Sequence, residues 1–222
     1  MLFMCLCYLD NGGFRLVYLS ARYGSFPTTN TFYVTAGMWG DSANKSPRQL
    51  TARLSVGADG RLVTSDLGDY PTTGYWAQVA KTTDAGATWS IVFEDFDSDL
   101  YPNDIHCYDA STCSFVMEGM GAPQVVTTTD GGATWSRFTD SRGSSLMTVR
   151  MHGPSEVWAV GGGDKGRMWH TTDMVTWEAY EMDAKLTEPV ALLSVAFNGD
   201  KTIAYGTGAL RSQVCSIHKF EF

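Results

Sequence analysis

A short pattern that recurs three times constrains this chain more than any other feature. Thr82–Trp89 and Thr128–Trp135 share the frame T-x-D-x-G-x-T-W, and Thr171–Trp177 repeats it one residue shorter and without the glycine. Successive aspartates of the pattern are about 45 residues apart, which is the length of one four-stranded β-propeller blade. The residues that define the pattern are Thr82, Asp84, Gly86, Trp89, Thr128, Asp130, Gly132, Trp135, Thr171, Asp173 and Trp177.

Strand-like segments come before these patterns at regular intervals. Short apolar runs end in glycine at Phe32–Gly37, Phe115–Gly119, Val157–Gly161 and Ile203–Gly206, and other strand-like runs precede them at Arg15–Ser20, Leu146–Met151 and Leu192–Phe197. They are rich in β-branched and aromatic residues, and no stretch shows the 3.6-residue period of a helix. The sequence therefore predicts an all-β chain, a β-propeller of four-stranded antiparallel blades with about four blades visible.

The blades can be placed along the chain. Two complete blades are expected over 104–140 and 146–182, and a last blade of three strands begins near 191. The first blade spans 14–95 and is too long, because an insertion at 41–73 contains an expected hairpin turning at residues 58–60. We expect 1–222 to be a single propeller domain, or a C-terminal fragment of a larger propeller. Met1–Leu9 is a candidate fourth strand for the last blade.

Five cysteines bear on the cellular compartment. Cys107 and Cys113 flank a short turn-like stretch, and strands on either side would bring them within bridging distance. The predicted disulfide implies an oxidising compartment. Cys215 could pair with Cys5 or Cys7 and staple the closure of the ring. Asn44 lies in a glycosylation sequon, which agrees with a secreted protein but occurs often by chance.

Composition excludes several classes of function. The chain has 24 acidic and 16 basic residues, a net charge of −8, so nucleic acid and anionic membranes are poor partners. No apolar run reaches the roughly 18 residues of a membrane span. Hydrophobic residues make up 44% of the chain, enough to build a folded core.

The T-x-D-x-G-x-T-W frame resembles the Asp-box, or BNR repeat, that sialidases, sortilin-type receptors and photosystem II assembly-factor-type propellers share. In such a repeat the aspartate accepts backbone N–H bonds across the turn between the third and fourth strands, the glycine takes a conformation that other residues resist, and the tryptophan packs between sheets. The resemblance implies that the three aspartates are structural.

A closer resemblance covers about residues 15–222. Ala21–Trp39, Asp104–Cys107 and Cys113 look like a group of secreted Asp-box propellers from protists. This resemblance implies a secreted or lumenal location and the propeller fold more than it implies a function. The plastid lumen is the alternative location, by analogy with the photosystem II type.

An enzymatic function finds little support. A sialidase-like enzyme needs an arginine cluster and a tyrosine activated by a glutamate, but Phe14–Val17 lacks the proline of the usual arginine segment, and Glu118 beside Tyr108 is the one pair to inspect. The sequence contains no G-x-S-x-G, and its histidines lack metal-ligand spacing. We therefore predict no catalytic residue, no metal and no cofactor, with calcium in the acidic stretch Glu94–Asp104 as the exception to test.

The sequence favours a non-enzymatic interaction module for an unknown protein or glycan partner. The insertion distinguishes this chain, and three aromatic residues at its end are candidate binding residues: Tyr70, Tyr75 and Trp76. One alternative is an assembly subunit or factor of an organelle complex. The other is a sialidase-like glycoside hydrolase.

Overall fold

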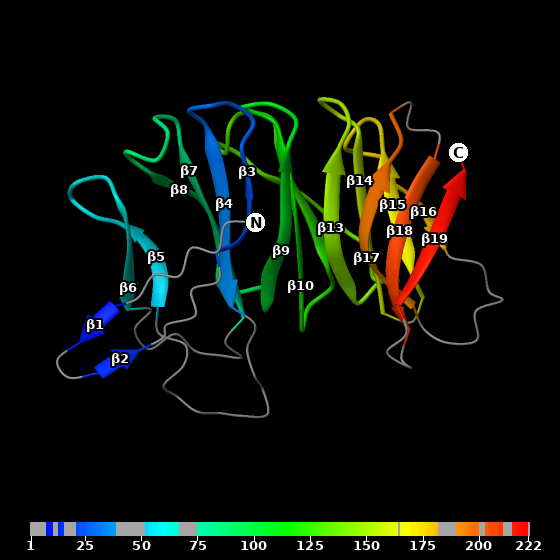
Figure 1. The fold of residues 1–222 in the computed structure, drawn as a ribbon, viewed down its shortest axis with the longest axis horizontal. Helices are drawn as coiled ribbons and strands as arrows, with labels where there is room; N and C mark the ends of the chain where they lie inside the picture. Colours follow the sequence, from blue (N-terminus) through cyan, green and yellow to red (C-terminus); the bar gives the residue numbers. More distant parts are fainter. Residues whose placement is uncertain are drawn as a thin grey trace. The chain divides into compact units, whose positions relative to one another are not determined.

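The structure is a computed structural model that describes residues 8–10, 13–15, 21–38, 52–66, 75–163, 165–181, 190–199, 203–210 and 215–221. Every regular element in these residues is a β-strand (Figure 1). The chain divides into two compact units, Met1–Pro102 and Asn103–Phe222. No helix in the described residues is long and apolar enough to cross a membrane.

The first unit is built on one four-stranded antiparallel sheet in the order β3-β4-β7-β8. Its strands are β3 (Ala21–Ser25), β4 (Phe32–Met38), β7 (Trp76–Thr82) and β8 (Ser90–Asp95). Two hairpins accompany the sheet: β1 (Tyr8–Asp10) pairs with β2 (Gly13–Arg15), and β5 (Ala52–Val56) pairs with β6 (Leu62–Asp66). The β5–β6 hairpin turns through Ala58-Asp59-Gly60, where Gly60 has a φ of 79°.

The second unit contains two four-stranded sheets and one three-stranded sheet, each in chain order and antiparallel. The strands are β9 (Leu100–Cys107, which begins in the first unit), β10 (Cys113–Gly119), β11 (Gln124–Thr128), β12 (Ser136–Thr139), β13 (Ser145–Met151), β14 (Val157–Gly162), β15 (Arg167–Thr171), β16 (Glu178–Glu181), β17 (Val190–Phe197), β18 (Ile203–Leu210) and β19 (Cys215–Glu221). The predicted fold class is confirmed: this is an all-β chain of four-stranded antiparallel blades.

Each sheet of the second unit packs face to face on the next. Val116 and Val125 of the β9–β12 sheet meet Val149 and Trp169 of the β13–β16 sheet in one buried cluster. The opposite face of β14 and β15 packs on Leu192 of β17 and its neighbours. Alternate side chains of a strand point to opposite faces, so one strand supplies both clusters.

The structure differs from the sequence prediction at the N-terminal end. The first strand of the first blade is Ala21–Ser25, whereas the run expected there was Arg15–Ser20. Tyr8 and Leu9, the described end of the expected closing strand Met1–Leu9, pair with Arg15 and Phe14 in a local hairpin. A local hairpin satisfies the strand's backbone without the entropy cost of a long closing connection. Cys5 and Cys7 lie outside the described residues.

Candidate functional site

Three turns connect the third and fourth strands of their sheets, and we call them the Thr-Asp turns (82–89, 128–135 and 171–177). In the second, Asp130 Oδ1 accepts hydrogen bonds from Thr128 Oγ1 at 2.8 Å and from the Thr134 backbone N–H at 2.9 Å. Its Oδ2 accepts one from Thr134 Oγ1 at 2.6 Å. Asp84 makes the same three bonds with Thr82 and Thr88. The carboxylate thus ties both ends of the turn together.

Backbone conformation explains the glycines of the pattern. Gly86 and Gly132 have φ values of 91° and 92°, a left-handed region in which a Cβ is strained. The third turn is one residue shorter, and Met174 takes the left-handed position with a φ of 61°. Asp173 Oδ1 still accepts the backbone N–H groups of Val175 and Thr176, so the pattern tolerates the missing glycine.

Hydrogen bonding keeps the three aspartates ionised. The hydroxyl of Thr134, with its backbone N–H, lowers the pKa of Asp130 to about 2. Thr88 lowers the pKa of Asp84 to about 2, and the backbone of Thr176 does the same for Asp173. A carboxylate with its lone pairs committed to its own turn acts as a structural acceptor and not as a proton donor near neutral pH.

Cys107 and Cys113 form a disulfide across the β9–β10 hairpin, with their Cα atoms 3.9 Å apart. We call residues 107–113 the disulfide loop. The Tyr108 N–H donates to the Thr112 carbonyl at 2.9 Å. Asp109 Oδ1 accepts the N–H groups of Ser111 and Thr112 at 2.8 and 2.7 Å. A covalent bond, a backbone bond and an Asx turn therefore hold the disulfide loop, with its five residues between the cysteines, in one conformation.

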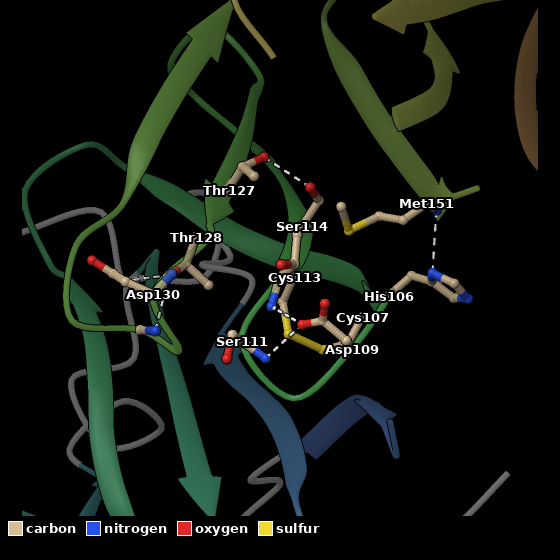
Figure 2. Close-up of a disulfide and its surroundings, with 12 residues drawn as sticks. His106, Cys107, Asp109, Ser111, Cys113, Ser114, Thr127, Thr128, Asp130 and Met151 are labelled. Atoms are coloured by element: carbon tan, nitrogen blue, oxygen red, sulfur yellow. Dashed lines mark hydrogen bonds between the residues drawn. A yellow bond between two sulfur atoms is a disulfide. The ribbon is translucent and has the colours of Figure 1, made fainter. Parts of the chain in front are cut away.

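The disulfide loop is also bonded to the second Thr-Asp turn. The Gly131 N–H donates to the Ser111 carbonyl at 2.8 Å, and the hydroxyls of Ser114 and Thr127 lie 2.8 Å apart on the adjoining strands. Figure 2 shows the loop and the Asp130 turn on neighbouring parts of one sheet. Tyr108 is nevertheless 49% exposed, so this rigid composite presents an aromatic side chain to solvent.

Within the second unit, side chains of β9 form hydrogen bonds with the backbone of β13. The Val149 N–H and Arg150 Nη1 both donate to Asp104 Oδ2, at 3.1 and 2.7 Å. The Met151 N–H donates to His106 Nδ1 at 3.2 Å, the contact visible at the right of Figure 2. These bonds satisfy backbone donors of β13, an edge strand that has a ladder partner only on the β14 side.

Burial shifts the pKa values of Asp104 and His106, which form one row on β9. It raises the pKa of Asp104, against the opposing effect of the Arg150 guanidinium. Burial, together with the charge of Arg150, lowers the pKa of His106 to about 4. His106 is therefore neutral at physiological pH, with Nδ1 free of a proton so that it can accept the Met151 N–H.

A second polar cluster surrounds Glu156 in the β13–β14 turn. Its Oε1 lies 4.0 Å from His152 Nδ1 and 3.7 Å from His170 Nε2, and it accepts the indole N–H of Trp158 at 3.3 Å. The imidazole of His170 stacks on Trp158 with ring centres 3.8 Å apart. Burial lowers the pKa of His170, with Glu156 opposing the shift. The cluster is an ordered, half-buried junction of aromatic and ionisable side chains.

The predicted binding aromatics lie elsewhere. Tyr75 and Trp76 are 7% and 4% exposed, in contact with the rings of Tyr101 and Phe96, so they are packing residues and not surface contacts. Their burial follows from the sheet packing around β7, which the local sequence does not reveal. Tyr70 and Asn44 lie outside the described residues.

The pair inspected for catalysis does not meet. Tyr108 follows β9 next to the Cys113 end of β10, whereas Glu118 lies toward the other end of β10, about 16 Å from Cys113 at strand spacing. In the acidic stretch, Asp95 Oδ1 accepts the N–H groups of Asp97 and Ser98. No three histidine, cysteine, aspartate or glutamate side chains in the described ranges are grouped to hold a metal ion.

Sequence reasoning missed the row formed by Asp104 and His106 and the cluster around Glu156. One signal was available: Asp104 and His106 alternate on one strand, so they point to the same face. What they contact depends on the neighbouring sheet, and no local pattern in the sequence carries that information.

Comparison with known proteins concerns the fold. No family description matches the chain, and no curated protein matches it. Among solved structures, a GH74 xyloglucanase from Xanthomonas campestris shares 13% identity at a TM-score of 0.52, over 90% of this chain and 36% of that one. A structure of YCF48 bound to D1 peptide shares 16% identity at 0.47, over 88% and 52%. YCF48 from Cyanidioschyzon merolae shares 19% identity at 0.42, over 78% and 58%.

This chain spans less than two thirds of the length of each of these three proteins. The likeness to the xyloglucanase supports the β-propeller fold, and at this identity it supports nothing further.

Proposed function

We propose that this protein is a non-enzymatic propeller module of an oxidising, secreted or lumenal compartment, and that it binds a protein partner through the disulfide loop. The observation that carries the proposal is a rigid loop with an exposed aromatic side chain. A disulfide, an Asx turn and the Gly131–Ser111 bond fix the loop, while Tyr108 is 49% exposed. A preordered tyrosine loses little conformational entropy when a partner covers it.

The ionisable groups of β9 and of the second Thr-Asp turn fit binding better than catalysis. Asp130 is committed to its own turn, and Asp104 is bonded to Arg150. His106 is held neutral, with Nδ1 occupied by a backbone donor. A glycosidase would need two carboxyl groups facing one another across a substrate. A glycan ligand, an organelle assembly partner and hydrolase activity remain outcomes that the test must be able to return.

The test compares Tyr108→Ser with Tyr23→Ser, a matched control because Tyr23 is a similarly exposed tyrosine in the first unit. Each oxidised protein is immobilised and presented with secreted and lumenal proteins of the source organism and with a glycan array. We expect a protein partner that the wild type and the control retain, and that the Tyr108 variant binds at least about tenfold more weakly. Equal binding by both variants, binding of glycans alone, or glycan cleavage would contradict the proposal.

A further inference from the structure

The side-chain amide of Gln78, on β7, forms hydrogen bonds with the backbone of the β5–β6 hairpin, as the backbone of a neighbouring strand would. The Leu54 N–H donates to Gln78 Oε1 at 2.8 Å, and Gln78 Nε2 donates to the Leu54 carbonyl at 3.0 Å. Gln78 is fully buried. Its amide therefore replaces the backbone pair that a neighbouring strand would supply, and a buried amide satisfied in this way is costly to separate.

Two further contacts fix the hairpin. Its tip is bonded to the first Thr-Asp turn, because the Trp89 N–H donates to the Gly60 carbonyl at 2.8 Å. Its apolar side packs on the sheet: buried Leu54 forms one cluster with Ala36 and Ala80, and Leu62 packs against that cluster. The hairpin covers the β4–β7 surface on which these alanines lie.

The other side of the hairpin is mostly polar. Arg53, Ser55 and Ser65 alternate with the inward residues, and the hydroxyls of Ser55 and Ser65 lie 2.5 Å apart. Val63 is the exposed apolar residue on this side, at 40%; on the inner side Val56, next to the tip, is 39% exposed, so the apolar contact with the sheet rests on Leu54 and Leu62. An element with an apolar inner face and a polar outer face is what ends a stack of repeats, because it covers the last repeat without offering a surface for another.

Register shows which face of the sheet is covered. Ala80 lies two residues before Thr82 and pairs with Val34, just as Trp169 lies two residues before Thr171 and pairs with Ala159. In the second unit, the Ala159–Trp169 face packs on the preceding sheet, through Val116 and its neighbours. The equivalent Val34–Ala80 face of the first unit packs on the β5–β6 hairpin instead.

We propose that the β5–β6 hairpin takes the place of a preceding blade on the β3-β4-β7-β8 sheet. It closes this face to any further blade and to a second copy of the chain. The hairpin of the insertion therefore covers the Val34–Ala80 face, the surface on which a preceding blade would pack. Releasing it uncovers an apolar surface with the shape of a blade interface, and the occupant that fits such a surface is the equivalent sheet of another copy.

The test uses a buried and an exposed substitution of the same kind. Leu54→Asp places a charge under the hairpin, and Val63→Asp places the same charge on its outer face. Light scattering after size exclusion gives the molecular mass at micromolar concentration, and hydrogen exchange reports β4, β7 and, as a reference, β13–β15. We expect a monomeric wild type and Val63→Asp. Leu54→Asp should double in mass while β13–β15 exchange as in the wild type.

A second variant, Gln78→Leu, covers the case in which Leu54→Asp fails to fold. Gln78→Leu removes the two hydrogen bonds between the Gln78 amide and the Leu54 backbone, which we call the clasp, without placing a charge in the core. We expect the β5 amides of Gln78→Leu to exchange at least about tenfold faster than in Val63→Asp. A wild type that already self-associates through β4 and β7 would overturn the proposal. So would a folded Leu54→Asp that stays monomeric, or β5 amides that exchange alike in Gln78→Leu and Val63→Asp.

Discussion

The carboxylate of Asp104 on β9 lies 2.7 Å from the guanidinium of Arg150 on β13, and the same oxygen accepts the Val149 N–H. One buried side chain thus holds a charge and a backbone donor of the next sheet. This contact joins the first strands of two blades at a place where no backbone ladder connects them.

Replacing Asp104 by alanine should destabilise the protein by about 2 kcal/mol, because the Val149 N–H would lose its acceptor in a buried position. Solvent screening weakens the ion pair between Asp104 and Arg150, because the Arg150 side chain is 34% exposed. Arg150→Met should cost less, about 1 kcal/mol, since Asp104 keeps its backbone donor. Urea unfolding of the two variants measures this order, and a larger loss in Arg150→Met would contradict it.

His106 should make stability depend on pH. Its folded pKa of about 4 lies below the ordinary value of 6.5, so the unfolded chain binds the proton first. Stability is therefore complete above about pH 6.5 and falls as the pH is lowered toward 4. His106→Asn keeps an acceptor for the Met151 N–H and cannot titrate. Urea unfolding at pH 7 and pH 5 should show a smaller loss in this variant, and an equal loss would refute the assignment.

Exchanging alanine and glycine at the equivalent positions 85 and 131 of the first two Thr-Asp turns should change stability in opposite directions. Ala85 has a φ of 59° where the second turn has Gly131 at 76°. Ala85→Gly should relieve left-handed strain and stabilise by about 0.5–1 kcal/mol, and Gly131→Ala should destabilise by about 1 kcal/mol. Both N–H groups bond carbonyls, of Asn30 and Ser111 respectively, and both bonds survive the exchange. Thermal unfolding of both variants tests the sign, and equal signs would contradict the prediction.

Gly161 should not tolerate a side chain. A Cβ at this position would lie 2.0 Å from the Ser145 carbonyl oxygen, so β13 and β14 would have to separate. Gly161→Ala should cost about 3 kcal/mol. Gly199→Ala is the control, because nothing lies within 4 Å of a Cβ there. Chemical unfolding that places the two variants at the same stability would contradict the packing described for these strands.

Removal of the disulfide should have a moderate effect on stability. The bond closes a loop with a sequence separation of 6, so the chain-entropy relation gives about 2 kcal/mol. Cys107→Ser with Cys113→Ser should therefore unfold at lower urea with the same slope. Its hydrogen exchange should rise at Tyr108 and Gly131, the two donors that the loop organises. Unchanged exchange at Gly131 would show that the loop and the turn are independent.

Local patterns were sufficient for much of the fold. The Thr-Asp turns could be placed from sequence because Asp130 bonds residues within four positions of itself, and the spacing of such turns marks the blades. The Cys107–Cys113 pair was predictable for the same reason, since a short turn brings the two residues together whatever surrounds them.

Only the tertiary structure decided what the sheet faces contact. Tyr75 and Trp76 are buried, Tyr108 is exposed, and Asp104 meets Arg150 because of how whole sheets pack. The clasp between Gln78 and Leu54 joins residues on two separate hairpins, and neither residue's local sequence indicates the other. Turn chemistry acts over a few bonds along the chain, whereas burial is a property of surfaces that meet only after the strands have paired.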